Sequence, residues 1–195
     1  MHEKFMIEAI KEANKSLEIN EVPVGAVIVK NGKIISRGHN IKEKKQSSLA
    51  HAEIIAIEKA TRKVKNWRLI DCDIYVTLEP CPMCTSAIKQ SRIKKIYYGA
   101  ESTDNNNHKI FQDICNSSDN NDKINYYHNI MQLECSELLR KFFASKRWNK
   151  CSIKTVKKYI LQYFVKFYLV KVKDFLLKIW YNISDWKWKY VSSFI

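Results

Sequence analysis

Apolar residues recur at helical spacing at the start of the chain. One face of a helix over residues 3–17 carries six of them, namely Phe5, Met6, Ala9, Ile10, Ala13 and Leu17. A β-branched run over residues 22–30 follows, and residues 33–37 can return antiparallel to it. Between them Asn31 and Gly32 supply the two positive-φ positions of a tight turn. The pattern therefore predicts an amphipathic helix and then a β-hairpin.

Later segments alternate between helical and strand-like patterns. After a polar loop, the predicted elements are a helix over 51–63, a strand over 73–78, a helix from Pro80, a strand over 95–99 and a helix over 134–148. Helices between consecutive strands require parallel crossovers. The order of elements therefore predicts an α/β fold, a three-layer α/β/α arrangement around a mixed sheet.

Two segments differ from this pattern. Residues 101–122 are rich in Asn, Asp and Ser and predict a long irregular insertion, anchored in part by apolar residues near position 111. Residues 151–195 place aromatic and aliphatic residues at helical spacing among lysines, which interrupt every stretch long enough to cross a membrane. We expect one domain over residues 1–150 and a basic amphipathic helical tail over residues 151–195.

Composition and charge limit the possible partners and the cellular location of the protein. The 195 residues are 46% hydrophobic, enough for one sizeable core, and the formal net charge is +14. Such a charge favours polyanionic partners, either nucleic acid or acidic lipid. The six cysteines are scattered, and the N-terminus has no apolar signal-peptide core. These features predict a cytoplasmic protein without a disulfide framework.

Candidate chemistry begins at the Cys-x-x-Cys pair formed by Cys81 and Cys84. Alone, this pair is compatible with half a zinc ribbon, a redox motif or two buried thiols. A second Cys-x-x-Cys is absent, but His51 and Glu53 lie upstream at a distance that one helix and one strand fill. Three ligands of the His and Cys type leave a tetrahedral zinc one open position, which is typical of catalytic sites.

We therefore expect one zinc ion bound by His51, Cys81 and Cys84. The two cysteines fall in the first turn of a predicted helix, where the helix dipole favours thiolate. Glu53 is assigned as the proton carrier rather than a ligand. Singly, such a histidine is more often a helix cap and such a glutamate a surface residue. Their joint order, His-x-Glu and then Pro-Cys-x-x-Cys, is the signature of zinc-dependent nucleobase deaminases.

The chain resembles the cytidine-deaminase-like superfamily, and within it most closely the bacterial tRNA-specific adenosine deaminases that act on the anticodon wobble position. The matching segments are EVPVGAVIV (21–29), GHN (38–40), AHAEIIAI (50–57), NWRLIDCDIYVTLEPCPMC (66–84), SRIKKIYYGA (91–100) and ECSELLRKFF (134–143). They span most of residues 1–148, and the tail has no counterpart. This resemblance implies a cytidine-deaminase-like fold for the main domain.

The resemblance also implies an activity, hydrolytic deamination of adenosine to inosine at the wobble position of tRNA. In that family the three residues matching His51, Cys81 and Cys84 bind zinc, and the residue matching Glu53 is the general acid and base. Asn40 is then expected to hydrogen-bond the target base, although asparagine is also a common turn former. Similar proteins are homodimers, so a homodimer is implied.

A basic aromatic segment follows in the last predicted helix of the domain. Phe142, Phe143, Lys146 and Arg147 are similar to the family's closing helix, where such side chains meet the anticodon loop. Aromatic faces stack on unpaired bases, and Lys or Arg neutralises phosphate. Ordinary core packing of the two phenylalanines is the alternative.

Two loops depart from the family pattern and leave other functions open. Residues 47–51 read SSLAH where the family usually has DPTAH, so the loop over 41–49 is altered. Residues 101–112 contain no glycine where the tRNA enzymes carry a Gly-rich loop. The AESTD segment is similar to guanine deaminases, so deamination of a free base or nucleoside (guanine, cytosine or adenine) is the alternative.

A third hypothesis is a non-catalytic, deaminase-like binding module. The tail itself has three interpretations: a helix packed on the domain or on a dimer mate, a basic arm on RNA, or an interfacial membrane helix. Packing with RNA contact is the interpretation we favour, and membrane association is the less favoured one.

Overall fold

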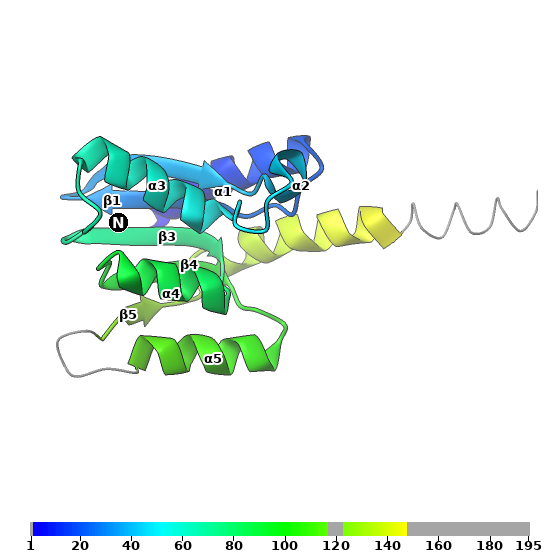
Figure 1. The fold of residues 1–195 in the computed structure, drawn as a ribbon. Coiled ribbons are helices and arrows are strands. Elements are labelled where there is room, and N and C mark those ends of the chain that lie inside the picture. Colours follow the sequence, from blue (N-terminus) through cyan, green and yellow to red (C-terminus); the bar gives the residue numbers. More distant parts are fainter. Residues whose placement is uncertain (1, 117–122, 148–195) are drawn as a thin grey trace, which may run out of the picture. The chain divides into compact units, whose positions relative to one another are not determined.

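The computed structural model describes residues 2–116 and 123–147 (Figure 1). Residues 132–147 are helical and follow the last strand. The preceding elements are α1 (Glu3–Glu18), β1 (Gly25–Lys30), β2 (Lys33–His39), α2 (Lys42–Lys45), α3 (Ala52–Val64), β3 (Cys72–Leu78), α4 (Pro82–Gln90), β4 (Lys95–Ala100), α5 (Asn105–Asn116) and β5 (Asn125–Tyr127).

The strands form one five-stranded sheet in the order β2-β1-β3-β4-β5. Strand β1 is antiparallel to β2 and β3, whereas β3, β4 and β5 run parallel to one another. The turn between β1 and β2 contains Asn31 at φ 50° and Gly32 at φ 72°, as predicted from these two residues. The mixed sheet and its parallel crossovers are therefore confirmed.

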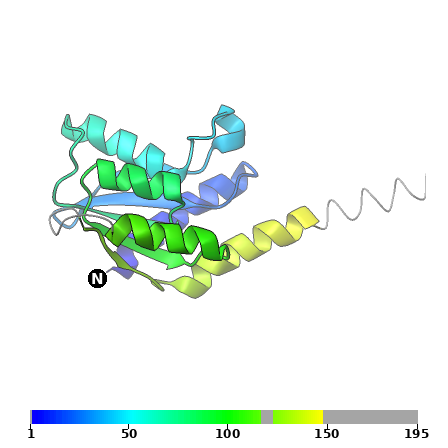
Figure 2. The same cartoon turned by 60° about the horizontal axis from the view of Figure 1, so that its bottom comes forward.

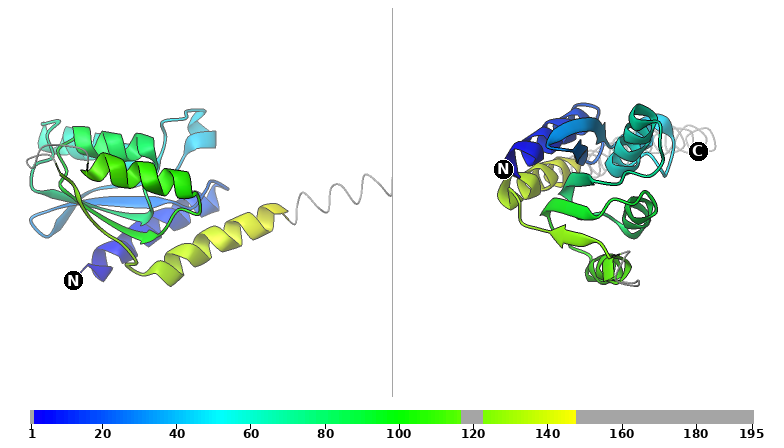
Figure 3. Two further views of the ribbon diagram at one scale, coloured as in Figure 1. Left: turned by 90° about the horizontal axis from the view of Figure 1, so that it is seen from below. Right: turned by 90° about the vertical axis from the view of Figure 1, so that its left-hand side faces the viewer.

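Alternate residues of the central strands feed two separate cores. Val27 and Tyr75 pack toward α1, in a cluster that also contains Cys135 from the helix that starts at residue 132. Ala26 and Ile74, one position away in each strand, pack into the cluster formed with α3, α4 and α5. Figure 2 and Figure 3 show these helices on one side of the sheet and α1 on the other. The three layers follow from the period-two alternation of a sheet buried on both faces.

Two glycines allow helices to lie close to the sheet. A Cβ atom at Gly25 would collide with the backbone of α1 at Ala9, and one at Gly99 would collide with the side chain of Cys135. Helices on this face therefore approach β1 and β4 more closely than a residue with a side chain would permit.

The prediction of an irregular segment over 101–122 was wrong for its central part, because Asn105–Asn116 form α5. The carboxylate of Asp104 accepts hydrogen bonds from the backbone N–H groups of Asn106 and Asn107, which begins the helix. Two residues of this helix, Phe111 and Cys115, are buried. The polar composition reflects an exposed outer face, whereas two buried positions one turn apart hold the helix on the sheet. Residues 117–122 lie outside the described part.

The chain consists of two compact units, Met1–Ala144 and Ser145–Ile195. The predicted domain boundary at residue 150 and the predicted tail helix lie outside the described residues. Among the helices of residues 2–116 and 123–147, none is both long enough and apolar enough to cross a membrane.

Candidate active site

Helices α3, α4 and α5 all begin at one edge of the sheet, on the right-hand side of Figure 1. At the same edge β3 and β4 end, where Leu78 pairs with Ala100. His51 is the N-cap of α3 and Cys81 is the N-cap of α4, each with extended backbone. Pro82 occupies the first position of α4, where its missing N–H costs no hydrogen bond. This arrangement brings together His51 and Cys81, which are 30 positions apart in the sequence.

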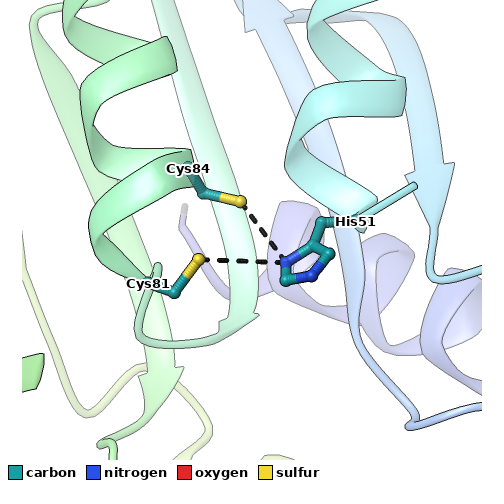
Figure 4. A group of neighbouring side chains, drawn as sticks. All are labelled: His51, Cys81 and Cys84. Carbon is teal, nitrogen blue, oxygen red and sulfur yellow. Dashed lines mark hydrogen bonds between the residues drawn. The ribbon is translucent and has the colours of Figure 1, made fainter. Parts of the chain in front are cut away.

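The three predicted ligands converge as expected of a zinc site (Figure 4). His51 Nδ1 lies 3.6 Å from Cys84 Sγ and 3.9 Å from Cys81 Sγ, and one ligand atom from each residue lies within 4.8 Å of the others. Tetrahedral zinc with Zn–S of about 2.3 Å and Zn–N of about 2.05 Å separates nitrogen from sulfur by about 3.6 Å. The arrangement therefore fits a zinc ion with three protein ligands.

The acidity of the two thiols also points to a cation. A hydrogen bond from the Cys84 thiol lowers the pKa of Cys81 to about 4, and His51 acts in the same direction. That hydrogen bond to Cys81 raises the pKa of Cys84, as does burial. Two adjacent thiolates are therefore unfavourable without a positive charge between them. A bound divalent ion removes this conflict because it attracts both sulfurs.

Glu53 lies in the first turn of α3 and is only 4% exposed. Its Oε2 atom has no hydrogen-bond partner among the described residues. Burial raises the pKa of this carboxyl, and the nearby Cys81 acts in the same direction. A raised pKa brings a carboxyl closer to neutral pH, where a proton carrier is most effective.

Asn40 directly follows β2 and is buried at the start of α3. Its Oδ1 atom accepts a hydrogen bond of 2.8 Å from the backbone N–H of Ala52. This bond satisfies one of the otherwise unpaired N–H groups at the helix start and fixes the orientation of the amide. No hydrogen bond from Nδ2 is present within the described residues, so the amide retains donors for a base.

A model of the cytidine and deoxycytidylate deaminase zinc-binding region matches residues 1–100. The tRNA-specific adenosine deaminase of Bacillus subtilis (strain 168) is 40% identical over 148 residues, covering 76% of this chain and 92% of that protein. The tRNA-specific adenosine deaminase of Buchnera aphidicola subsp. Schizaphis graminum is 41% identical over 144 residues, covering 74% and 95%.

Two solved structures of deaminases are also similar to this chain. One, from a study of A-to-I editing by tRNA:A34 deaminases at the wobble position of transfer RNA, is similar with a TM-score of 0.63 at 36% identity, covering 70% of this chain and 99% of that one. The guanine deaminase of Bacillus subtilis is similar with a TM-score of 0.52 at 36% identity, covering 65% and 84%.

This chain belongs to the zinc-dependent deaminase family that contains the tRNA-specific adenosine deaminases. Family membership confirms the cytidine-deaminase-like fold and zinc as the cofactor. The individual roles of His51, Cys81, Cys84, Glu53 and Asn40 rest on the geometry above and stay predictions.

The four predicted RNA contacts of this family member divide between the two units of the chain. Phe142 is buried at 6% exposed, whereas Phe143 is 48% exposed, and the two rings meet edge to face at 5.3 Å. Core packing is therefore the observed role of Phe142, and Phe143 presents a ring to solvent. Lys146 and Arg147 belong to the unit that begins at Ser145, and their contact with RNA stays a prediction.

The altered loop over residues 41–49 is ordered beside the metal ligands. The backbone N–H of Ile41 bonds to the carbonyl of Ala50, and the N–H of Ala50 bonds to the carbonyl of Ser47. These bonds hold Leu49, which is 57% exposed two residues before His51. An exposed apolar side chain therefore lies two positions before one of the predicted zinc ligands.

The interaction of a buried glutamate with a half-buried histidine next to the site was missed from the sequence. The carboxylate of Glu79 accepts a hydrogen bond of 2.8 Å from His108 Nδ1 and a longer one from the backbone N–H of Ser102. The Glu79 side chain is 1% exposed, and its Oε1 atom has no partner among the described residues. A glutamate directly after the buried strand β3 was the available signal, but its partner on α5 depends on the tertiary fold.

Proposed function

We propose that this protein converts adenosine to inosine at the wobble position of a tRNA anticodon by zinc-dependent hydrolysis. His51, Cys81 and Cys84 would hold the zinc ion. When bound, zinc acidifies a water molecule and so supplies a nucleophile at neutral pH. The target is C6 of the flipped adenine base.

Glu53 moves the protons of this reaction. Its unpartnered Oε2 atom accepts one proton from the attacking water and donates it to a ring nitrogen. Glu53 then carries the second proton of that water, from the new hydroxyl at C6 to the amine, which leaves as ammonia while the C6 carbonyl forms. Asn40 orients the base, since its Oδ1 atom is engaged by Ala52 and its amide nitrogen can donate to an acceptor on the ring.

The observation that carries the proposal is the meeting of a His-Cys-Cys ligand set with a buried carboxylate that lacks a partner. The choice of tRNA over a free base is supported by family membership and by the net charge of +14. The segment similar to guanine deaminases has a structural role here, because the carboxylate of Asp104 caps α5.

The direct test is incubation of purified, zinc-loaded protein with tRNA that carries adenosine at the wobble position, followed by sequencing for inosine. We expect conversion at that position by the wild type and none by Glu53→Ala. An unchanged wobble adenosine with zinc bound would contradict the proposal. Ammonia release from free guanine, cytosine, adenine or adenosine, measured in parallel, would favour the free-base alternative.

A homodimer forms part of the proposal. The side chains of Leu49 and Phe143 are exposed and apolar, which supports burial of these positions against a partner subunit. Sedimentation equilibrium tests this assembly, and a monomer at micromolar concentration would count against it. The five described cysteines are free, which supports a reducing, cytoplasmic location.

We further propose that residues 1–150 form the deaminase domain and that the basic tail over residues 151–195 contacts RNA. The nine lysines and two aspartates of the tail support an anionic partner. Liposome flotation with and without residues 151–195 tests the alternative. Flotation of the full chain alone would assign the tail to a membrane surface.

A further inference from the structure

A second group of basic residues gathers at the edge of the sheet opposite the candidate active site. Strands β3 and β4 are parallel and pair Asp73 with Lys95 at their beginnings and Leu78 with Ala100 at their ends. Because the metal ligands follow the end of β3, the beginnings of both strands lie at the other edge, about 20 Å away over a seven-residue strand. Antiparallel β1 brings its turn with β2 to this same edge.

Two loops build this edge and are bonded to each other. One joins α3 to β3 and contains Trp67 and Arg68; the other joins α4 to β4 and contains Arg92 and Lys94. The backbone N–H of Leu69 in the first loop bonds at 2.8 Å to the carbonyl of Ser91, just ahead of the second loop. Figure 1 shows both loops at the left-hand side of the sheet.

Between these loops and the β1–β2 turn lies a cavity of about 640 Å³, which we call the basic cleft. Its lining includes four cationic side chains and two carboxylates, namely Arg68, Arg92, Lys94, Lys95, Asp71 and Asp73. The cationic groups outnumber the carboxylates, and a volume of several hundred Å³ accommodates a small organic group with its phosphate. Arg92 and Lys94 also have other interactions in the protein, so the experiment below changes Arg68 and Lys95, which are both exposed.

An aromatic ring stands next to the basic cleft. Trp67 is 51% exposed, and the Arg68 guanidinium lies 4.0 Å from the centre of its ring. Ile70, which lines the cleft, is 53% exposed. A ring held by a stacked guanidinium and open on its other side is a platform for an unpaired base, while lysine and arginine side chains neutralise phosphates.

We propose that the basic cleft binds a phosphodiester segment of RNA outside the reacting anticodon loop, with Arg68 and Lys95 at phosphates and Trp67 stacking on a base. The inference rests on the proposed function, since it assigns the cleft to the same tRNA substrate. The separation of about 20 Å between the candidate active site and the basic cleft is short compared with a folded tRNA. One tRNA molecule can therefore contact both sites of one subunit, or the active site of one subunit and the basic cleft of its partner. RNA is favoured over a free nucleotide because the active site already recruits a polynucleotide.

The test compares the wild type with the double variant Arg68→Ala/Lys95→Ala. The matched control is Lys11→Ala/Arg62→Ala, which removes the same two kinds of charge from exposed helix faces outside the cleft. Dissociation constants for full-length tRNA and for an isolated anticodon hairpin are measured between about 50 and 200 mM salt, a range over which phosphate contacts weaken strongly. Inosine formation on the hairpin is measured in parallel.

We expect the cleft variant to bind full-length tRNA roughly tenfold more weakly than the wild type. The salt slope, which is the slope of log K for binding against log salt concentration, should be smaller in magnitude by about 1.5–2, because each phosphate contact contributes about 0.9. The control should retain the wild-type slope within about 0.5. Both variants should deaminate the hairpin at the wild-type rate. Trp67→Ala should weaken tRNA binding about 5- to 100-fold, and Trp67→Phe should restore most of it.

An unchanged affinity and salt slope in the cleft variant would overturn the inference, as would equal losses in the cleft variant and the control. Titration with adenosine monophosphate distinguishes the other source of phosphate. Saturable binding that Arg68→Ala/Lys95→Ala abolishes, without any change toward tRNA, would assign the cleft to a free nucleotide and overturn the RNA assignment. A failure of the proposed function can be told apart from a failure of this inference, because the wild type itself would then form no inosine.

Discussion

Replacement of Glu53 by glutamine removes a buried carboxylate while the shape of the side chain is kept. Glu53 is 4% exposed and its Oε2 atom has no hydrogen-bond partner in the described part of the chain. The glutamine amide leaves the same position without a partner, but a neutral amide costs less to bury than a carboxylate, by about 1–3 kcal/mol. We therefore expect metal-free Glu53→Gln to be more stable than the metal-free wild type by about 1–3 kcal/mol.

In a chain of this length that gain corresponds to an increase of about 2–12 °C in Tm, since about 2–4 °C accompanies each kcal/mol. The same substitution removes the proton carrier, so zinc-loaded Glu53→Gln should form inosine about 100- to 10,000-fold more slowly. Stability and activity are thus expected to change in opposite directions at one position.

The assay combines calorimetry of the chelated proteins, zinc analysis of the loaded proteins and inosine formation on tRNA. Glu58→Gln is the matched control, because Glu58 lies on the same helix with its side chain 57% exposed. It should change the free energy of unfolding by less than about 0.5 kcal/mol and leave activity intact. A Tm of Glu53→Gln at or below that of the wild type would refute the reasoning about burial. Activity above roughly a tenth of the wild type would refute the proton-carrier role.

Four further outcomes are expected. Chelation of zinc should abolish inosine formation, and added Zn²⁺ but not Mg²⁺ should restore it, because thiolate ligands select zinc; restoration by Mg²⁺ would contradict the assigned ligands. Asn40→Asp keeps the acceptor that caps α3 but loses the donor for the base, so kcat/KM should fall about 10- to 100-fold with Tm within about 3 °C. His108→Ala should destabilise the protein by about 1–3 kcal/mol in urea unfolding, because the buried carboxylate of Glu79 loses its close partner; an unchanged midpoint would mean that water replaces the ring. Phe142→Ala should lower the free energy of unfolding by about 3–5 kcal/mol, because it leaves a cavity in the core. Phe143→Ala should instead raise KM for tRNA and leave the stability nearly unchanged. The opposite result would contradict the roles assigned to the two rings.

Local patterns were enough to predict most of the elements. A β-branched apolar run located β1, short strand-like segments located β3 and β4, and Asn31-Gly32 located the turn between β1 and β2. Those signals are carried by neighbouring residues, and so they are readable without the fold. The same reasoning missed α5, because its sequence is mostly polar and only two buried positions, Phe111 and Cys115, hold it on the sheet.

The ligand set could be predicted because the spacing of its motifs reflects local structure. His51 and Cys81 each precede a helix, and a crossover of known type separates them, so the convergence follows from the order of the elements. The partner of Glu79 could not be predicted. His108 lies 29 residues away on α5, which is positioned by packing of Phe111 against Tyr98 of β4 and Tyr126 of β5.

The sequence by itself determined the chemistry of the candidate site, since residue types and short spacings decide which atoms can bind zinc and carry protons. Only the tertiary structure decided which of these atoms are buried or lack a partner, as at Glu53, and which distant loops meet, as at the basic cleft. The reason is physical. Helix and strand periodicity act between near neighbours, whereas burial and long-range contact depend on how whole elements pack across the sheet.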